Sequence, residues 1–315
     1  MAIEVIRYTP VLREEWNSFV KGAVNSTFLF MRDYMDYHSD RFRDCSLMFY
    51  CDNSLIALLP ANIKEGEGVL QSHGGLTYGG LIMHPDTKAT DTLEIFEALT
   101  NYMRNSINVN KLLYKPLPYI YNSRPADEPL YALFRMGATI AARAISTTID
   151  NGNRQAFGSQ RLRGMKKAQK AGITCTPSTQ YRAFWNILTD TLRTAHNCTP
   201  THTIEEIELL QSRFPDNIKL YTASMREEAV AGIVVYETES VAHFQYIAAS
   251  PAGKTHGALD ALVNYLINEV YAQKRFIDFG ISTEQGGTIL NSGLIEQKEG
   301  FGGRAVVYDT YELCV

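Results

Sequence analysis

The chain has 315 residues, enough for two domains of ordinary size. Its composition, 45% hydrophobic and 20% charged residues, is that of a folded globular protein and excludes a chain that is mostly disordered. The net charge of −4 is too small to identify a partner, and we expect no DNA partner.

The location and the redox state are also expectations from the sequence. No apolar run reaches the roughly 18 residues that a transmembrane helix needs, and MAIEVIRYTP lacks the segments of a signal peptide. We therefore expect a cytoplasmic protein without a transmembrane segment. The five cysteines are irregularly spaced and form no CxxC pair, so we expect reduced thiols and no metal site.

The first half of the chain has the pattern of an α+β unit. Strands are expected over 46–50, 54–62 and 69–72. A helix is expected over about 90–107, because apolar residues recur there at helical spacing. A short strand over 111–114 follows.

The segment SHGGLTYGGL lies between the third strand and this helix. Its four glycines indicate a bulged backbone, or one that another segment approaches closely. His73 and Tyr78 are candidate substrate contacts in this segment. The alternative is a structural bulge with a satisfied histidine.

The second half repeats the same order of elements. Strands are expected over 219–224, 229–237 and 241–248, then a helix over 256–273 and a strand over 276–279. The repetition favours a duplication. We place the boundary at the turn 150–152, which gives an N-terminal domain over 1–150 and a C-terminal domain over 151–315. The last strand is a candidate to return to the first domain.

A basic helix is expected over 157–171, at the start of the second half. Four cations fall on one stripe of this helix at positions i, i+3, i+4 and i+7: Arg163, Lys166, Lys167 and Lys170. Arg163 and Lys167 are therefore candidate contacts to a phosphate or carboxylate. The alternative is an ordinary solvated helix face.

The most specific motifs lie near the C-terminus. A strand ends in Asp278-Phe279-Gly280, and the run 298–303 reads Lys-Glu-Gly-Phe-Gly-Gly. These motifs resemble the closing segment of the Fem family of aminoacyl-transferring cell-wall enzymes, although Gln297 stands where that family has an aromatic residue. The basic segment RLRGMKKAQKAGI is similar to the helix that opens the second Fem domain.

The resemblance extends to the wider GNAT-like acyltransferase superfamily, including a bacterial group associated with surface polysaccharides. It implies an α+β fold of two tandem GNAT-like domains, each a mixed twisted sheet flanked by helices. It also implies that Lys298 is catalytic and stabilises negative charge on the reacting carbonyl. The alternative is a surface lysine in a glycine-rich turn.

Other candidates surround these motifs. Glu284 is a second catalytic candidate, for relaying a proton or binding the amine, and a solvated loop carboxylate is its alternative. Ser282 and Phe301 are candidate substrate contacts within the motif region. His243 and Gln245 are expected on one face of their strand and Phe244 and Tyr246 on the other, and either face is a candidate for the substrate side, through His243 or Tyr246.

The donor site is expected at the start of the helix over 256–273. GNAT enzymes hold the pyrophosphate of an acyl-CoA on a glycine-rich turn at this point, and this chain offers Lys254 and Gly257 there. Leu259 stands where a small residue is expected, so the pyrophosphate grip is weak. The co-substrate is therefore left open between acyl-CoA and aminoacyl-tRNA.

The sequence thus predicts an N-acyltransferase or aminoacyltransferase that acts on an amine of a cell-envelope or polysaccharide precursor, which is a small-molecule or glycan-precursor substrate. An acyl-CoA-dependent GNAT N-acetyltransferase is the first alternative. A non-catalytic binding protein that keeps the duplicated fold is the second.

Overall fold

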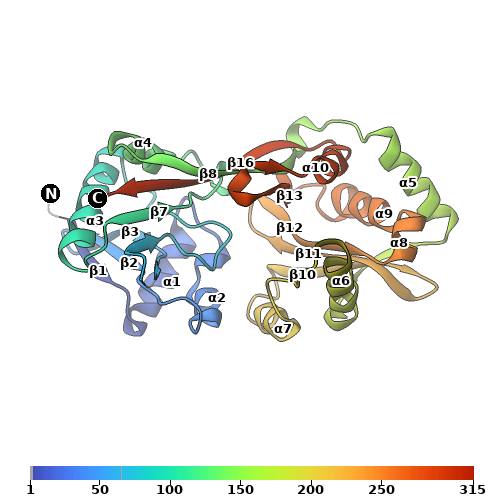
Figure 1. Cartoon of the computed structure of the whole chain (residues 1–315), viewed down its shortest axis with the longest axis horizontal. Coiled ribbons are helices and arrows are strands. Elements are labelled where there is room, and N and C mark those ends of the chain that lie inside the picture. Colours follow the sequence, from blue (N-terminus) through green and yellow to red (C-terminus); the bar gives the residue numbers. More distant parts are fainter. Residues whose placement is uncertain (1–2, 65) are drawn as a thin grey trace. The chain divides into compact units, whose positions relative to one another are not determined.

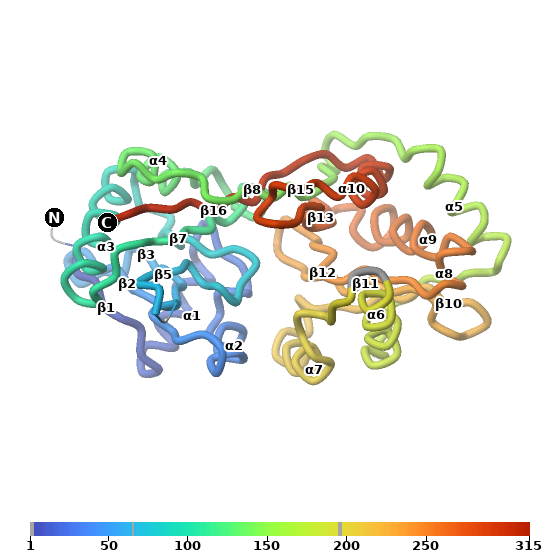
Figure 2. The backbone as a smooth tube through the Cα atoms, in the orientation of Figure 1, coloured from blue at the N-terminus to red at the C-terminus, as the bar shows by residue number. Residues whose placement is uncertain are grey.

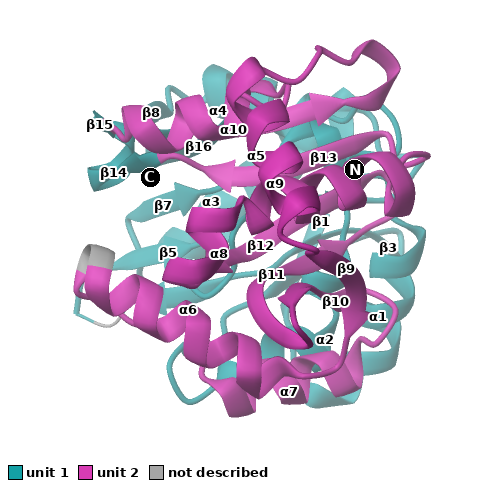
Figure 3. Cartoon of the chain, turned by 90° about the vertical axis from the view of Figure 1, so that its right-hand side faces the viewer, with its two compact units in different colours: residues 1–144, 283–289, 307–315 teal, residues 145–282, 290–306 magenta. Residues whose placement is uncertain are grey.

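The computed structural model describes residues 3–64 and 66–315, with the backbone alone for 195 and 196 (Figures 1 and 2). The chain forms two compact units, coloured separately in Figure 3. Unit 1 extends to residue 144 and adds 283–289 and 307–315, and unit 2 comprises 145–282 and 290–306.

Unit 1 is built from short strands and a few helices. In chain order its elements are β1 (Ile3–Arg7), α1 (Arg13–Gly22), α2 (Arg32–Met35), β2 (Leu47–Cys51), β3 (Ser54–Leu59), β4 (Asn62–Lys64), β5 (Val69–Gln71), β6 (Ile82–Met83), α3 (Ala89–Asn105), β7 (Lys111–Tyr114), α4 (Glu128–Arg135) and the start of β8 (Thr139–Asp150). One sheet has the order β1-β2-β3-β6, and β4, β5 and β7 are neighbours in a second sheet.

The helix expected over 90–107 is confirmed as α3, and its apolar face forms the core of unit 1. Ile95, Phe96 and Leu99 are each at most 1% exposed. They belong to one buried cluster with residues of β2, β5 and β7. The expected strand over 54–62 is two strands, β3 and β4, which belong to different sheets.

The glycine-rich segment of unit 1 is approached closely by its neighbours, as its composition predicts. A Cβ atom at Gly79 would stand 2.1 Å from the carbonyl oxygen of Ser72. Gly80 has φ +85°, and a Cβ there would meet the hydroxyl of Tyr114 at 2.9 Å. Glycine is required at both positions because no side chain fits.

Unit 2 contains the longer strands. Its elements are the end of β8, α5 (Ser159–Lys170), β9 (Thr174–Ser178), α6 (Tyr181–His196), α7 (Ile204–Arg213), β10 (Ile218–Met225), β11 (Glu228–Glu237), β12 (Val241–Ala249), α8 (Pro251–His256), α9 (Ala258–Tyr265), a π-helical turn (Leu266–Val270), β13 (Phe276–Ile281), α10 (Ser292–Glu299) and the start of β16 (Arg304–Cys314). The strand order is β8-β13-β12-β11-β10-β9, and two short strands, β14 (Thr283–Glu284) and β15 (Ile289–Leu290), pair with each other.

The long helix expected over 256–273 differs from the structure. Gly257, with φ +72°, separates α8 from α9, and the last turn is π-helical. A glycine in the left-handed backbone conformation can end a helix, because the last carbonyls of the helix then find hydrogen-bond donors and no Cβ atom clashes. The apolar periodicity predicted the buried face of α9 but could not show this break.

A β-bulge in β12 overturns the expected sorting of its side chains. The pairing with β11 shifts between Val234 and Val235, so Gln245 is the extra residue. Phe244 then belongs to the core beneath α9, whereas Tyr246 packs on Trp185 of α6. Because one inserted residue reverses the alternation, Tyr246 lies on the opposite face of the strand from Phe244 and shares the face of His243.

The parallel strands β12 and β13 pair over a short stretch and then separate. Their register runs over Val241↔Phe276, Ala242↔Ile277 and His243↔Asp278. Both strands continue beyond the last pair, β12 to Ala249 and β13 to Ile281. The separation leaves His243 and Asp278 at the point where the two strands part.

None of the helices in the described part of the chain is both long and apolar enough to cross a bilayer.

Packing of α6 on the sheet depends on Gly232 of β11, where a Cβ would meet the Phe184 ring at 2.3 Å. We expect Gly232→Ala to lower the free energy of unfolding by about 1–3 kcal/mol, because overpacking forces the ring out of place. Gly22→Ala is the matched control, since a Cβ added at Gly22 would have no atom within 4 Å. Urea titration measures both, and equal midpoints for the two variants would contradict the expectation.

Candidate functional site

Lys298 lies near the end of α10 with its ammonium buried. The side chain of Asn291 caps this helix by accepting a hydrogen bond from the backbone of Leu294 at 3.0 Å. Lys298 is 6% exposed, and its Nζ donates to the carbonyl oxygens of Gly280 and Ile281, each at 2.8 Å. The alternative of a surface lysine in a glycine-rich turn is therefore wrong.

Burial changes the proton affinity of this lysine. Loss of solvation lowers the pKa of Lys298 from its usual 10.5 to about 8, and the negative charge of Asp278 opposes this shift. A buried lysine with a pKa near the working pH is typical of functional sites, although structural ion pairs can have the same property.

A buried acid–imidazole pair lies at the point where β12 and β13 separate. The Nδ1 atom of His243 is 2.7 Å from Oδ2 of Asp278. The other carboxylate oxygen accepts hydrogen bonds from the hydroxyls of Ser146 and Thr148 on β8. Burial alone would raise the pKa of Asp278, but the hydrogen bonds and charge of His243, with the two hydroxyls, hold it below its ordinary value.

The glycines of the second motif serve close packing around these groups. Gly302 has φ +89°, and a Cβ there would stand 2.4 Å from the carbonyl of Gln155. Phe301 is 2% exposed and stacks on Phe279 at 5.7 Å between ring centroids. Phe301 is thus a core residue that joins the two motifs, and its predicted contact with a substrate stays untested.

Ser282 is the residue that directly follows β13. It is 1% exposed, and within the described residues its hydroxyl makes no hydrogen bond. Its backbone amide donates to Ile145 and its carbonyl accepts from Asn291, so the residue is held firmly. A buried hydroxyl without a partner is unusual and marks a place where a ligand or water would find one.

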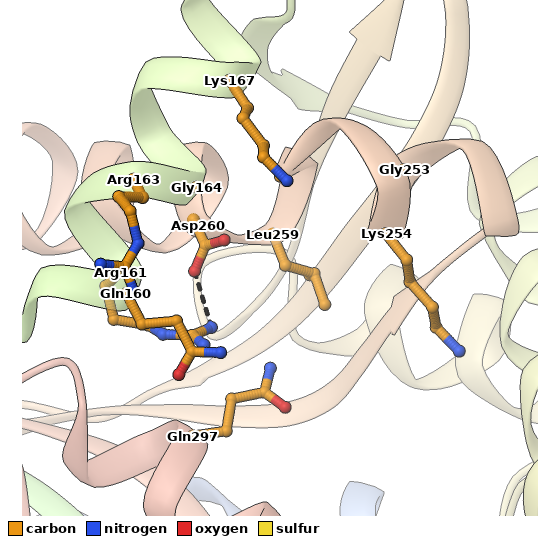
Figure 4. Close-up of a pocket in the computed structure, with 11 residues that line it drawn as sticks. Gln160, Arg161, Arg163, Gly164, Lys167, Gly253, Lys254, Leu259, Asp260 and Gln297 are labelled. Atoms are coloured by element: carbon orange, nitrogen blue, oxygen red, sulfur yellow. Dashed lines mark hydrogen bonds and ion pairs between the residues drawn. The ribbon is translucent and has the colours of Figure 1, made fainter.

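A cationic pocket lies at the junction of α5 with α8 and α9 (Figure 4). The pocket has a volume of about 550 Å³. The structure brings four of the predicted residues together in its lining: Arg163, Lys167, Lys254 and Gly257. Lys166 lines a different pocket with Leu162 and Met165, and Lys170 lines neither, so the four cations of the predicted stripe do not share one pocket.

An ion pair inside this pocket was not predicted. Arg161 Nη1 is 2.8 Å from Oδ1 of Asp260, drawn as a dashed line in Figure 4, and both side chains are at most 14% exposed. A Cβ at Gly164 would meet the Asp260 carboxylate at 1.8 Å, and one at Gly257 would meet the Gly164 carbonyl at 2.3 Å. The glycines therefore allow α5 to pack directly on the start of α9.

Helix α8 and the glycine that ends it use several of their backbone amides internally. The amide of Gly253 donates to the side chain of Ser250, which caps α8, and the amide of Lys254 donates to the Ser250 carbonyl. The amide of Gly257 donates to the carbonyl of Lys254. An anion in the pocket would therefore rely mainly on the side chains of Arg163, Lys167 and Lys254.

Several predicted residues are not among those that line the pocket. His73 and Tyr78 are buried in unit 1, where the Tyr78 hydroxyl donates to Thr27 at 3.3 Å. Tyr246 is 8% exposed and its hydroxyl bonds to the ring of His202. Glu284 is an exposed residue of β14 in unit 1.

Three functional-looking residues were missed by the sequence analysis. Asp260 and Gln297 line the cationic pocket. The signal for Asp260 in the sequence was an acidic residue directly after Leu259, at the start of the expected helix. Lys115 of unit 1 donates to the carbonyl of Leu76, and burial lowers its pKa to about 8. No sequence pattern marks Lys115, because its burial comes from segments distant in the chain.

Metal ligands do not gather in the described part of the chain, where no group of three His, Cys, Asp or Glu residues could hold an ion.

Comparison with known proteins identifies a GNAT domain in the second half of the chain. Residues 159–285 match the family model described as an acetyltransferase (GNAT) domain. No curated protein matches the chain by sequence.

Many solved structures resemble the whole chain, and three of them illustrate the likeness. FemX has a TM-score of 0.67 at 10% identity, covering 99% of this chain and 97% of its own. L-PGS from Bacillus licheniformis has a TM-score of 0.62 at 14% identity, covering 98% and 92%. A tandem GNAT protein from the clavulanic acid biosynthesis pathway has a TM-score of 0.52 at 11% identity, covering 98% of each chain.

These likenesses establish the fold. The resemblance in fold to Fem-type and GNAT-like proteins is confirmed, and the chain has an α+β fold of two tandem GNAT-like domains. At such low identities, the comparisons carry no residue roles to this chain.

The buried ammonium has a consequence for stability that can be measured. Because the pKa of Lys298 is lower in the folded chain than in the unfolded chain, the unfolded state binds more protons between pH 8 and 10.5. Lys298 therefore contributes a gain in unfolding free energy as pH rises through this window, about 3 kcal/mol in total. We expect Lys298→Met to lack this gain. Denaturant titrations at several pH values test it, and parallel pH dependences for the two proteins would contradict it.

Proposed function

We propose that the chain is a cytoplasmic N-acyltransferase or aminoacyltransferase that moves an acyl or aminoacyl group to an amine of a cell-envelope or polysaccharide precursor. The observation that carries the proposal is the buried Lys298 ammonium, held where β12 and β13 separate. The GNAT-like fold supports it, as does the Fem-type motif pair in which this lysine lies.

Lys298 has the donor capacity that acyl transfer needs. An ammonium carries three N–H donors. Two are directed to the carbonyls of Gly280 and Ile281, which leaves one for a reacting carbonyl. In a buried site, such a donor stabilises the developing oxyanion more than the ground state, and this difference accelerates the reaction.

In this proposal the cationic pocket holds the phosphate part of the donor. Arg163, Lys167 and Lys254 are its cations, because Arg161 is already paired with Asp260. Side-chain cations suit the phosphates of an aminoacyl-tRNA, whereas a CoA pyrophosphate is usually held by backbone amides at a helix start. The amides of Gly253, Lys254 and Gly257 make hydrogen bonds within α8 and at its end, which favours the aminoacyl-tRNA.

An acyl-CoA-dependent N-acetyltransferase is the second candidate. The match of residues 159–285 to an acetyltransferase domain model favours it. A non-catalytic binding protein with the same fold is the remaining alternative, and the imperfect donor turn is the feature in its favour.

The donor class can be identified by thermal shift. We expect the melting temperature of the full chain to rise with aminoacyl-tRNA more than with acetyl-CoA or a nucleotide sugar, because ligands of the folded state stabilise it. The double variant Arg163→Gln/Lys167→Gln should lose this shift, and Lys170→Gln, from the same helix, should keep it. A shift with acetyl-CoA alone would establish the second candidate, and no shift with any donor would favour the binding protein.

The role of Lys298 can be separated from binding. With the donor so identified, we expect Lys298→Met to lower kcat by about 10²–10³-fold, the usual effect of removing one oxyanion donor. The thermal shift by the donor should remain, because the transition state and not the bound donor is affected. Lys170→Met is the control for removing a positive charge. An unchanged kcat in Lys298→Met would exclude Lys298 from the mechanism.

A further inference from the structure

His243 and Asp278 occupy a special place in the sheet of unit 2. They form the last register pair before β12 and β13 separate. Hydrophobic residues fill most of these strands, yet this position carries an imidazole and a fully buried carboxylate joined at 2.7 Å. Burying such a pair is rarely needed for stability, because apolar residues of similar volume serve as well.

The hydrogen bonds around Asp278 fix the state of the imidazole. The hydroxyls of Ser146 and Thr148 donate to one carboxylate oxygen, so the other is left for Nδ1 of His243. An ionised carboxylate accepts but cannot donate, so the neutral imidazole carries its proton on Nδ1. The lone pair of the ring is therefore on Nε2.

Nε2 is the ring nitrogen that Asp278 does not occupy. The His243 side chain is 11% exposed whereas Asp278 is 0% exposed, and within the described residues Nε2 makes no hydrogen bond. A Cβ at Gly280 would stand 3.4 Å from Cε1 and 4.0 Å from Nε2 of this ring. Glycine at this position leaves the space beside the ring edge unfilled.

The same glycine connects the imidazole to the buried cation. The carbonyl of Gly280 accepts a hydrogen bond from Lys298 Nζ at 2.8 Å. The imidazole and the ammonium therefore both lie next to one residue of β13. A base and an oxyanion donor must both reach the atoms of one reacting carbonyl and amine, and Gly280 is the neighbour that these two groups share.

We propose that His243 is the general base of the transfer, accepting the proton of the attacking amine on Nε2, with Asp278 as its positioning residue. The inference rests on the proposed acyltransferase function. The neutral amine forms a bond from nitrogen to the acyl carbon, and its proton passes to Nε2. The bond from the acyl carbon to the donor oxygen or sulfur breaks, and the leaving group takes the proton from the imidazolium. The products are the amide and the free hydroxyl or thiol, and the imidazole is neutral again.

The titratable groups around the imidazole are Asp278 on β13, Lys298 on α10 beside Gly280, and Tyr236 on β11, which lies opposite His243 in the register. The base must be neutral, so activity falls as pH drops and the ring is protonated. Lys298 must be charged, so activity also falls as pH rises above about 8.

The catalytic claim is tested by kcat/KM against pH in His243→Asn, whose amide can still donate to Asp278. We expect a loss of about 10²–10⁴-fold and disappearance of the acid limb. Added imidazole should restore part of the activity in His243→Ala, which a purely structural role would not allow. His84→Asn, which removes an exposed imidazole, is the control. Full activity with an unchanged acid limb in His243→Asn would overturn the inference while leaving the transferase function intact.

A second experiment needs no substrate and separates the two proposals. Diethylpyrocarbonate modifies free imidazole nitrogens, and mass spectrometry locates the modified residue. We expect His243 to react in the folded full chain, and to react at least about tenfold more slowly in Asp278→Asn, where the amide reverses the tautomer. An unreactive His243 in the folded wild type would overturn the inference. Absence of transfer with every donor would defeat the proposed function, and the labelling would still decide whether Nε2 is a free base.

Discussion

The candidate site of unit 2 depends on the burial of the Lys298 ammonium beside the point where β12 and β13 separate. Lys298 can be buried because the carbonyls of Gly280 and Ile281 accept its hydrogen bonds. Those carbonyls are available because β13 leaves β12 after Asp278 and is no longer paired with it. Burial lowers the pKa of Lys298 and the two carbonyls leave one of its N–H donors unused, so the geometry that disfavours the charged state also provides a donor for chemistry.

Close backbone approach is the second constraint. Gly302 admits the carbonyl of Gln155, and Gly164 admits the carboxylate of Asp260. The first contact seats the loop that follows α10 and so helps to fix Lys298. The second packs α5 on α9 and shapes the cationic pocket. Glycine in these motifs therefore has a packing role, and any exposed amides for ligands are secondary.

The prediction of secondary structure succeeded where periodicity is a local property. Helix α3 and strands β10 to β13 were recognisable because their apolar residues repeat at the spacing of their own backbone. The bulge at Gln245 and the break at Gly257 were missed, since each depends on one residue whose effect appears only against a neighbouring strand or helix. Helix α10 was also missed, because it is short and carries two glycines at or near its ends.

The sequence by itself determined the order of elements, the basic helix and the motif pair that contains Lys298. Local patterns of apolar residues, charge and glycine encode all three. Only the tertiary structure decided that Lys298 is buried, that Arg161 is paired with Asp260, and that His243 meets Asp278. The partners in these contacts are separated by 17 to 99 residues, and burial and pairing at such separations arise from packing, which no local pattern records.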